Sequence, residues 1–370
     1  MSSKTVLIIA GESSGDLYGA ELLSKLRNKY HNLNFVGMGG EKLERLKPLE
    51  FISHQGVNVT GGVEVFRKIN HIVRTYRYIK KLIKKTHIDA AILIDFPDFN
   101  FLLFKHLKRK GIPIVYYVSP QLWAWRKGRV KKIQKYVDDM LVIFPFEVAW
   151  YEKHAVCAQY VGHPLVGFAQ AIDIHRTFPK NKIKIGLFPG SRENEVKRLL
   201  PPMIEAARKI NETIDAEFYL YKLSHIAQTH YAVAHNSTLP IKYVMKENMS
   251  QLKDVDFALA CSGTLTVELA LLKIPMVILY KLSPVSYYLG RLLIKGVKNI
   301  GMVNLILGES YFPEFIQNEV KPHDIAARTL EYLKSESKYN EALNKLDSFQ
   351  DRLSSHQNVV SCEQVVEKYV

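Results

Sequence analysis

The chain contains 370 residues, of which 47% are hydrophobic and 24% are charged, and this composition excludes an intrinsically disordered protein. Because a chain of this length exceeds one ordinary hydrophobic core, we expect two domains. The formal net charge of +15 points to a polyanionic partner, which nucleic acid, an anionic membrane surface or a phosphorylated substrate would each provide.

The cysteines and the first residues bear on cellular location. Cys157, Cys261 and Cys362 are widely separated and form no C-x-x-C pair, which argues against a disulfide framework and a zinc site. The opening sequence MSSKTVLIIAGESSGD has a short apolar run and then a turn, so it predicts a first strand rather than a signal peptide. No apolar run approaches the roughly 18 residues that span a bilayer. We expect a cytoplasmic protein, and attachment to a membrane surface stays open.

The first half of the chain alternates short apolar runs with longer helical patterns, which is typical of βαβ units and a parallel sheet. The first predicted helix runs from about Leu17 to Tyr30 and follows the turn GESSGD. The predicted strands of this half are Val6–Ala10, Asn34–Val36, Ala90–Ile94, Ile114–Val118 and Met140–Phe144.

A polar segment with two prolines interrupts the pattern, and we place an interdomain linker at residues 166–182. The predicted architecture is α/β, with two Rossmann-like domains, residues 1–165 and 183–322, facing each other. A strand-free helical stretch, residues 323–370, is expected to pack across the domain boundary. The second strand series comprises Ile183–Phe188, Glu217–Tyr221, Ile241–Val244, Phe257–Ala260 and Met276–Tyr280.

Two turns of the first half follow predicted strands. GESSGD at residues 11–16 matches neither a dinucleotide fingerprint nor a Walker loop, so it either admits a ligand or is a plain turn with Asp16 capping the helix. LIDFPDFN at residues 93–100 places two carboxylates where open α/β sheets bind ligands. Asp95 should point into the crevice as a candidate general base, whereas Asp98 is expected to cap the next helix.

Two basic stretches could contact anionic partners. Residues 64–85, EVFRKINHIVRTYRYIKKLIKK, form an amphipathic helix that either packs on the sheet or lies on an anionic lipid surface. Residues 119–136 combine Trp123 and Trp125 with six basic residues, a pattern that suits nucleic acid, a sugar phosphate, a membrane or simply a solvated face. The position of the tryptophans at a strand end favours a binding site.

Two turns of the second half suit a phosphate group. The turn Ser262–Thr264 exposes backbone N–H groups before a short helix, and Glu268 one turn later could hold the two hydroxyls of a ribose. The alternative is an ordinary α/β crossover with a capped helix. In LFPGSRENEV, residues 187–196, Arg192 could neutralise a diphosphate or could instead pair with Glu195.

Several of these motifs together resemble one family, the lipid-A-disaccharide synthases, which are glycosyltransferases of the GT-B type. The matching motifs are AGESSGD, IDFPDFN, YVSPQLWAWR, FPFE, PGSRENEV, SGTLTVELALLKIPMV and NLILG, and they follow the family's order up to about residue 315. One departure is GMGGEKL at residues 37–43, where the family often has Gly-Pro, so we assign that loop no contact.

The resemblance implies two Rossmann-like domains with the active site in the cleft between them. It implies transfer of a diacylglucosaminyl unit from UDP-2,3-diacylglucosamine to 2,3-diacylglucosamine 1-phosphate (lipid X). The products would be the β-1,6-linked lipid A disaccharide 1-phosphate and UDP. The enzyme would act peripherally on the inner face of the cytoplasmic membrane, without metal, cofactor or nucleic acid, as a monomer or homodimer.

The resemblance also implies roles for individual residues. Asp95 matches the proposed general base, and Arg192 and Asn304 match residues tied to activity at the nucleotide side. The substrate-binding candidates are Ser191, Arg192, Ser262, Gly263, Thr264, Glu268, Trp123 and Trp125. The candidates for contact with acyl chains or membrane are Phe66, Ile69, Ile72 and Val73.

Two rival interpretations differ in function. One is another UDP-sugar enzyme of the same fold, either a different transferase or a UDP-N-acetylglucosamine 2-epimerase, and an epimerase should not need the lipid-facing helix at residues 64–85. A basic nucleic-acid-binding protein without catalysis would bind in a strongly salt-dependent way. The basic residues match no recognised nucleic-acid module, and two Rossmann halves are typical of a nucleotide-using enzyme.

Overall fold

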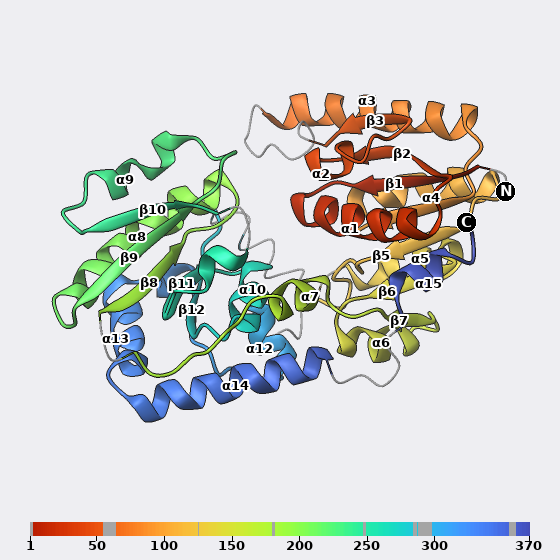
Figure 1. The fold of residues 1–370 in the computed structure, drawn as a ribbon. Helices are drawn as coiled ribbons and strands as arrows, with labels where there is room; N and C mark the ends of the chain where they lie inside the picture. Colours follow the sequence, from red (N-terminus) through yellow and green to blue (C-terminus); the bar gives the residue numbers. More distant parts are fainter. Residues whose placement is uncertain are drawn as a thin grey trace. The chain divides into compact units, whose positions relative to one another are not determined.

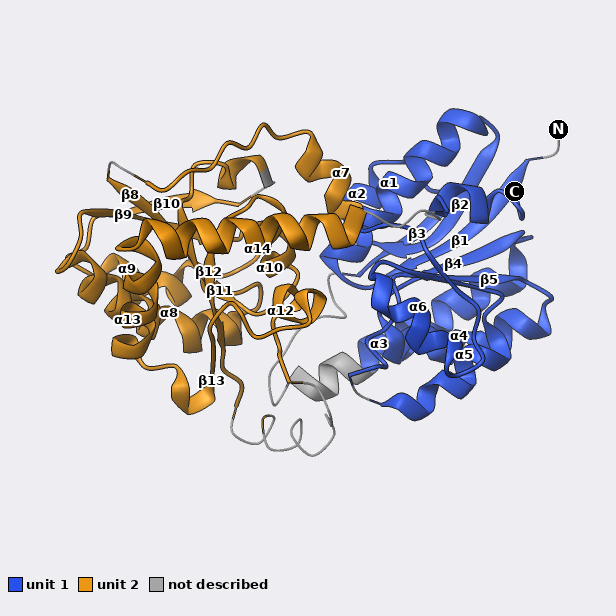
Figure 2. Cartoon of the chain, turned by 90° about the horizontal axis from the view of Figure 1, so that it is seen from below, with its two compact units in different colours: residues 1–163, 356–370 blue, residues 164–355 orange. Residues whose placement is uncertain are grey.

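The computed structural model describes residues 3–54, 64–124, 126–179, 182–246, 249–283, 287, 298–354 and 360–370, without the side chains of residues 64–69 and 249. The chain divides into two compact units (Figure 2). Unit 1 comprises residues 1–163 and 356–370, and unit 2 comprises residues 164–355. Each unit contains one parallel sheet, as the alternating sequence pattern predicts.

Unit 1 is built on a seven-stranded sheet in the order β3-β2-β1-β4-β5-β6-β7, with every pairing parallel. The central strands are fully buried apolar runs because helices cover both faces of the sheet. The strands are β1 (Lys4–Ala10), β2 (Leu33–Gly39), β3 (Glu50–Ser53), β4 (Ala90–Ile94), β5 (Ile114–Tyr117), β6 (Asp139–Val142) and β7 (Ala158–Tyr160).

The helices of unit 1 lie on the two faces of this sheet. One face carries α1 (Ser13–Lys29), whose Gly19 packs so closely on Ile8 and Ile94 that a Cβ there would lie 3.0 Å or less from both side chains. Figure 1 shows α15, in blue, beside the elements of unit 1. The remaining helices are α2 (Glu41–Glu44), α3 (Glu64–Lys85), α4 (Pro97–Arg109), α5 (Val130–Tyr136), α6 (Pro145–Glu152) and α15 (Cys362–Val366), with a 3₁₀ turn at Lys127–Arg129.

Helix α3 has the bounds that its amphipathic pattern predicts. Its Ile79, Leu82 and Ile83 are buried in the same core as residues of α4 and the sheet, so this part of the helix packs on the sheet. The basic side chains that the structure describes in this helix, including Arg77 and Lys80, are exposed. Among the helices that the structure describes, none is long and apolar enough to cross a membrane.

Unit 2 is built on a six-stranded parallel sheet in the order β10-β9-β8-β11-β12-β13. Its strands are β8 (Ile183–Phe188), β9 (Ala216–Lys222), β10 (Ile241–Met245), β11 (Phe257–Cys261), β12 (Met276–Tyr280) and β13 (Glu314–Ile316). Its helices are α7 (Pro164–Gln170), α8 (Glu193–Asn211), α9 (Ala232–His235), α10 (Leu265–Leu271), α12 (Met302–Leu307), α13 (Pro322–Leu333) and α14 (Glu336–Ser354). Single 3₁₀ turns lie at Gln228–Tyr231, Met249–Leu252 and Gln317–Glu319.

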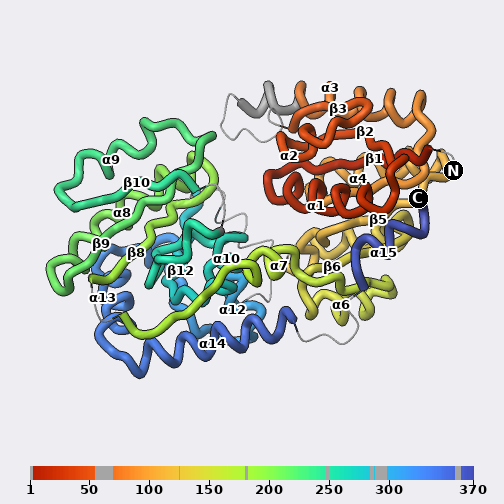
Figure 3. The backbone as a smooth tube through the Cα atoms, viewed as in Figure 1, coloured from red at the N-terminus to blue at the C-terminus, as the bar shows by residue number. Residues whose placement is uncertain are grey.

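The C-terminal stretch is helical, as predicted, and its helices belong to both units. Helix α13 packs on α8, and α14 runs past α10 and α12 of unit 2 (Figure 3). Helix α15 packs on α1 of unit 1, where Lys25 pairs with Glu363 at 3.2 Å.

Each predicted strand overlaps an observed one, whereas β3, β7 and β13 escaped prediction. These three strands contain only three or four residues each and lie at the edges of the two sheets. An edge strand has fewer neighbours to cover it, and the residues of β3 and β13 are all partly exposed or exposed. Their sequences therefore contain no apolar run long enough to predict a strand.

The segment expected to be a linker begins with a helix. The division between the units falls at His163–Pro164, and α7 belongs to unit 2. Arg176 then attaches the following residues to unit 2, because its guanidinium donates to the carbonyl oxygens of Leu272 and Val255 at 2.6 and 2.5 Å. Part of residues 166–182 is thus firmly packed chain rather than a free connection.

Candidate active site

Asp95 follows the central strand β4, at the carboxyl edge of the sheet in unit 1. Asp95 and Phe96 both have positive φ angles, +42° and +45°, which side-chain-bearing residues rarely adopt. The N–H of Asp95 donates to the Tyr117 carbonyl oxygen at 3.1 Å. The Asp95 carbonyl oxygen accepts hydrogen bonds from Tyr116 Oη and Asn100 Nδ2, both at 2.6 Å. The backbone of Asp95 is therefore fixed on both sides.

The sharp turn at Asp95 also explains the glycine of the first motif. The Phe96 ring lies over Gly11, where a Cβ atom would come within 2.2 Å of the ring. Only glycine fits beneath this ring, so the motifs at residues 11–16 and 93–100 meet in space. One interpretation of this turn was that Asp16 caps the helix that follows it, α1, and this is wrong because the N-cap residue of α1 is Glu12. The Asp16 carboxylate accepts from the N–H groups of Gly40, Lys42 and Leu43 and so caps α2.

Asp98 differs from Asp95 in its surroundings. The expectation that it caps α4 is wrong, since the N-cap position is Phe96 and Asp98 lies in the first turn. Its Oδ1 lies 2.6 Å from both Arg126 Nη1 and Arg129 Nη2. Burial alone would raise the pKa of Asp98, but the hydrogen bonds and charges of the two arginines outweigh burial and hold this pKa below its ordinary value. A carboxylate engaged in this way is a poor general base.

The tryptophan at residue 123 packs beside a buried carboxyl group. Trp123 Nε1 donates to Glu147 Oε1 at 3.2 Å, and its ring meets Phe146 edge to face at 5.1 Å between centroids. Glu147 is fully buried, and burial raises its pKa to about 8. Ser119 and Tyr151 form a further buried hydrogen bond at 2.8 Å. Trp125 lies outside the described residues.

The acyl-contact candidates of α3 have different surroundings. Ile72 is partly buried against the core of unit 1, while Val73 is 38% exposed. The side chains of Phe66 and Ile69 lie outside the described residues. Of the two described candidates, Val73 is the one with a surface available to lipid.

In unit 2, the turn after β11 has backbone N–H groups that the rest of the described chain does not use. Ser262 Oγ donates to the Ile300 carbonyl oxygen at 2.9 Å, which ties the turn to the chain before α12. Within the described residues, the N–H groups of Gly263, Thr264 and Leu265 have no hydrogen-bond partner. A Cβ added at Gly263 would meet no atom within 4 Å, so the space around it is open. These amides are available to an anion.

Glu268 carries an ion pair in this structure. Its Oε2 lies 2.7 Å from Lys246 Nζ at the end of β10, and both side chains are mostly buried. The carboxylate lies in the first turn of α10, three residues after the open turn. The ion pair with the lysine holds this carboxylate in place at the start of the helix.

The sequence left two roles open for Arg192, binding a diphosphate or pairing with Glu195. Arg192 Nη1 lies 3.3 Å from Glu195 Oε1, so the predicted pairing exists, and the arginine side chain is 58% exposed. Glu195 Oε2 also accepts from the N–H groups of Ser191 and Arg192, at 2.9 and 3.2 Å. The backbone of this turn is thus capped by its own glutamate. Gly190, with φ +124°, is required because a Cβ there would lie 2.5 Å from Glu195.

Asn304 is fully buried in α12 and bonds within unit 2. Its Nδ2 donates to the Phe312 carbonyl oxygen at 2.7 Å and to Glu314 Oε1 at 2.8 Å, and its Oδ1 accepts from the Phe312 N–H at 3.0 Å. Glu314 in turn accepts from the N–H groups of Ile300 and Gly301 at 2.7 and 3.0 Å. Since Ser262 bonds to Ile300, a continuous network connects Asn304 to the open turn.

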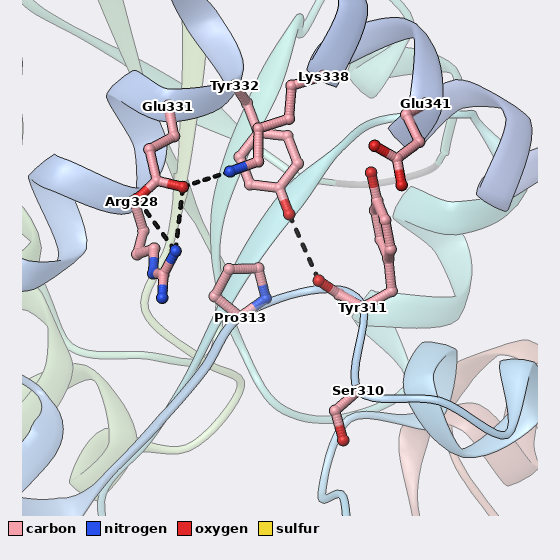
Figure 4. A pocket seen from close by; sticks show the side chains of 8 residues that line it. All are labelled: Ser310, Tyr311, Pro313, Arg328, Glu331, Tyr332, Lys338 and Glu341. Carbon is pink, nitrogen blue, oxygen red and sulfur yellow. Dashed lines mark hydrogen bonds and ion pairs between the residues drawn. The ribbon is translucent and has the colours of Figure 1, made fainter.

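A separate pocket of about 310 Å³ lies at the opposite end of the sheet in unit 2 (Figure 4). Pro313, which lines it, precedes β13, so the pocket lies at the amino ends of the strands. Its charged groups pair with one another, since Arg328 donates to both oxygens of Glu331 at 3.0 Å and Lys338 pairs with the same carboxylate. We therefore assign it no part in the candidate site. The lining residues are Ser310, Tyr311, Pro313, Arg328, Glu331, Tyr332, Lys338 and Glu341.

Comparison with known proteins decides between the interpretations that the motifs left open. The family model described as lipid-A-disaccharide synthetase matches residues 6–368. The chain belongs to this family. A lipid-A-disaccharide synthase from Coxiella burnetii (strain Dugway 5J108-111) is 37% identical over 374 residues, covering 97% of each chain. The resemblance seen in the motifs is confirmed, and the chain is a glycosyltransferase of lipid A disaccharide synthesis.

Solved structures agree on the fold. The structure of S. aureus MnaA with UDP matches with a TM-score of 0.63 at 12% identity, covering 96% of this chain and 98% of that chain. Acinetobacter baumannii MurG matches with a TM-score of 0.57 at 12% identity, covering 99% of each chain. At this identity the likeness shows the fold alone, and that fold is GT-B, as predicted.

Two acids that bond to the candidate residues Trp123 and Asn304 had not been singled out from the sequence. Glu147 lies in the FPFE motif, but nothing in the sequence distinguishes a buried acid from an exposed one at a helix start. Glu314 follows Pro313 in a short edge strand that was itself not predicted. The flanking residues Phe312, Pro313 and Phe315, with no charged neighbour, were the available signal that the Glu314 carboxylate bonds within the protein.

The buried Glu147 carboxyl predicts a pH-dependent stability. Since its pKa rises from 4.5 to about 8 on folding, the folded protein keeps a proton that the unfolded chain releases between these pH values. This contribution to stability is complete below pH 4.5 and is lost as the pH rises to about 8. Relative to Glu147→Gln, the unsubstituted protein should lose up to about 1.4 kcal/mol of unfolding free energy per pH unit. Urea unfolding of both proteins across this range measures the difference, and parallel curves would contradict a protonated Glu147.

Proposed function

We propose that this enzyme transfers the diacylglucosaminyl unit of UDP-2,3-diacylglucosamine to 2,3-diacylglucosamine 1-phosphate, with Asp95 as the general base. The observation that carries the proposal is the place of Asp95 at the carboxyl edge of the sheet, in a member of this family. Asp95 stands at the end of the central strand on a turn of unusual backbone geometry, and the nearby Asp98 is held by two arginines. Ligands of open α/β sheets bind at this edge.

The proposed reaction is a displacement at C1 of the donor sugar. The Asp95 carboxylate takes the proton of the acceptor 6-hydroxyl, and the freed oxygen forms a bond to C1. The bond between C1 and the UDP oxygen breaks, and its electron pair leaves with UDP. The products are the β-1,6-linked disaccharide monophosphate and UDP. No electron acceptor is required, and the proton on Asp95 returns to water.

Unit 2 would hold the nucleotide of the donor. The open N–H groups of Gly263, Thr264 and Leu265 suit the diphosphate, and Glu268 suits the ribose hydroxyls. The exposed Arg192 side chain would exchange its long contact with Glu195 for the charge that develops on UDP. Ser191, the residue before Arg192, would bind the nucleotide part of the donor beside it. Asn304 is buried, so we propose that it acts by holding the Ile300–Ser262 connection rather than by touching the substrate.

We further propose that unit 1 binds an anionic membrane surface through the exposed faces of α3 and α4, which would place the enzyme on the inner face of the cytoplasmic membrane. The two helices are joined by the hydrogen bond between Tyr76 Oη and His106 Nε2 at 2.6 Å. Burial is the largest cause that lowers the pKa of His106, and the positive charges of Lys80, Arg109 and Lys105 lower it further because they lie nearby. Leu102 lies in the same helix as Lys105 and is 48% exposed. Cations interspersed with exposed apolar side chains suit anionic lipid.

The first prediction concerns the base. Asp95→Asn should abolish UDP release from UDP-2,3-diacylglucosamine in the presence of lipid X, while the affinity for the donor changes less than about twofold, because a base acts in the chemical step. UDP release and mass spectrometry of the lipid product measure turnover, and calorimetry measures binding. Asp98→Asn is the matched control and should keep turnover. Near-normal turnover of Asp95→Asn would remove Asp95 from the mechanism.

The second prediction concerns the nucleotide side. Arg192→Ala should weaken donor binding and lower kcat together, each by about tenfold or more, because a charge-assisted contact to the leaving group is lost. Arg208→Ala is the control, since Arg208 in α8 is exposed and, like Arg192, pairs with a glutamate three residues away. If Arg192→Ala loses thermal stability but retains its kinetic constants, its role is structural.

The third prediction concerns the membrane surface. Replacing Lys80, Lys81 and Lys105 by Gln should weaken binding to vesicles of phosphatidylcholine with phosphatidylglycerol by about 100-fold, since each surface cation contributes about 1 kcal/mol. Co-sedimentation with the vesicles measures this binding, and vesicles of phosphatidylcholine alone should retain little protein.

The matched control removes the same charge from unit 2. Lys197, Lys209 and Lys321 are exposed, and their joint replacement by Gln should leave vesicle binding unchanged. Equal losses in the two triple variants would mean that only the net charge of the chain matters, and the α3–α4 surface would then have no special role.

A further inference from the structure

The turn that presents Asp95 is held by two buried side chains that the proposed reaction does not use. Asp95 and Phe96 adopt positive φ angles in succession, and each such residue strains the backbone. Such a conformation persists only where surrounding groups over-determine it. Here the groups are Tyr116, from the adjacent strand β5, and Asn100, from the first turn of α4. Both side chains are fully buried.

Both side chains aim at the same atom. Tyr116 Oη and Asn100 Nδ2 each donate to the Asp95 carbonyl oxygen at 2.6 Å, from two different secondary-structure elements. Burial raises the pKa of Tyr116 well above its ordinary value, so its hydroxyl stays protonated and remains a donor. Within the described residues Asn100 Oδ1 has no hydrogen-bond partner. A buried amide with one unused end is costly, so general stability does not account for Asn100.

The two donors fix the peptide plane between Asp95 and Phe96. The direction of a carbonyl oxygen sets the ψ angle of its own residue and the φ angle of the next, and the N–H of Asp95 is already held by Tyr117. With N–H and C=O both anchored, the Cα–Cβ bond of Asp95 has one direction relative to the sheet. The Phe96 ring, stacked on Phe99 at 5.6 Å, closes the turn from the other side.

We propose that Tyr116 and Asn100 are positioning residues that aim the Asp95 carboxylate at the acceptor hydroxyl. This inference rests on the proposed role of Asp95 as general base. Catalysis by a base requires the carboxylate within hydrogen-bond reach of the proton, and a displacement of about 1 Å can cost about 100-fold in rate. The two side chains influence the reaction only through the backbone of Asp95, so they act on kcat and not on substrate binding.

The test compares two buried tyrosines that make the same kind of bond. Tyr116→Phe should lower kcat by about 10- to 100-fold, with the KM of both substrates unchanged within about twofold. Tyr339→Phe is the matched control, because Tyr339 is equally buried and its Oη donates to the Asp256 carbonyl oxygen at 2.9 Å in unit 2. It should lose similar thermal stability and keep kcat.

Asn100→Leu provides a second variant should Tyr116→Phe fold poorly, and it should show the same fall in kcat at constant KM. The inference is overturned if either variant folds and keeps its kcat, or if Tyr339→Phe loses kcat to the same extent. Failure of the underlying assignment looks different: Asp95→Asn would then retain turnover, whatever the effect of Tyr116→Phe. An inactive Asp95→Asn together with a fully active Tyr116→Phe would leave Asp95 as the base and exclude its positioning by Tyr116.

Discussion

The constraint on which the structure depends is that every strand pairing in both sheets is parallel. Parallel strands need a crossover for each connection, so helices cover the sheets and the strands become continuous apolar runs. The same rule sends the turn after every strand to one edge. Within unit 1, the turns that follow β1, β4, β5 and β6 therefore lie along one edge of the sheet although they are far apart in the chain. Within unit 2, the same holds for the turns that follow β8 and β11.

Turns at such an edge leave backbone N–H groups unpaired, and this protein satisfies most of them with its own carboxylates. Asp16 caps the start of α2, Glu195 caps the start of α8, and Glu314 holds Ile300 and Gly301 before α12. An unpaired buried amide costs about 1–3 kcal/mol, so these acids are structural. The turn Gly263–Leu265 contrasts with them, since its amides have no partner within the described residues. This contrast is the reason why we propose that the turn holds the diphosphate of the donor.

The acidic residues of the family motifs thus have different tasks that their identity does not reveal. Asp98 neutralises two arginines, Glu147 is held protonated by burial, Glu268 pairs with Lys246, and Asp95 ends the central strand on a strained turn. The environment of each carboxyl group decides its protonation and its freedom to react. Part of the excess of basic residues is likewise concentrated in one place, because cations lie around His106 where α3 meets α4.

The sequence by itself determined the α/β class, the two units, most strands, the amphipathic helix at residues 64–85 and the family. These follow from periodicity and motif spacing, which are local properties of a chain. It also placed Asp95 and the turn at Ser262 at strand ends. Only the tertiary structure decided what each polar residue contacts: that Asp16 caps a helix other than its own, that Asn304 is buried, and that Tyr116 and Asn100 meet on one carbonyl oxygen. Those contacts join residues from different strands and helices, and their energies depend on burial, which no local pattern of side chains encodes.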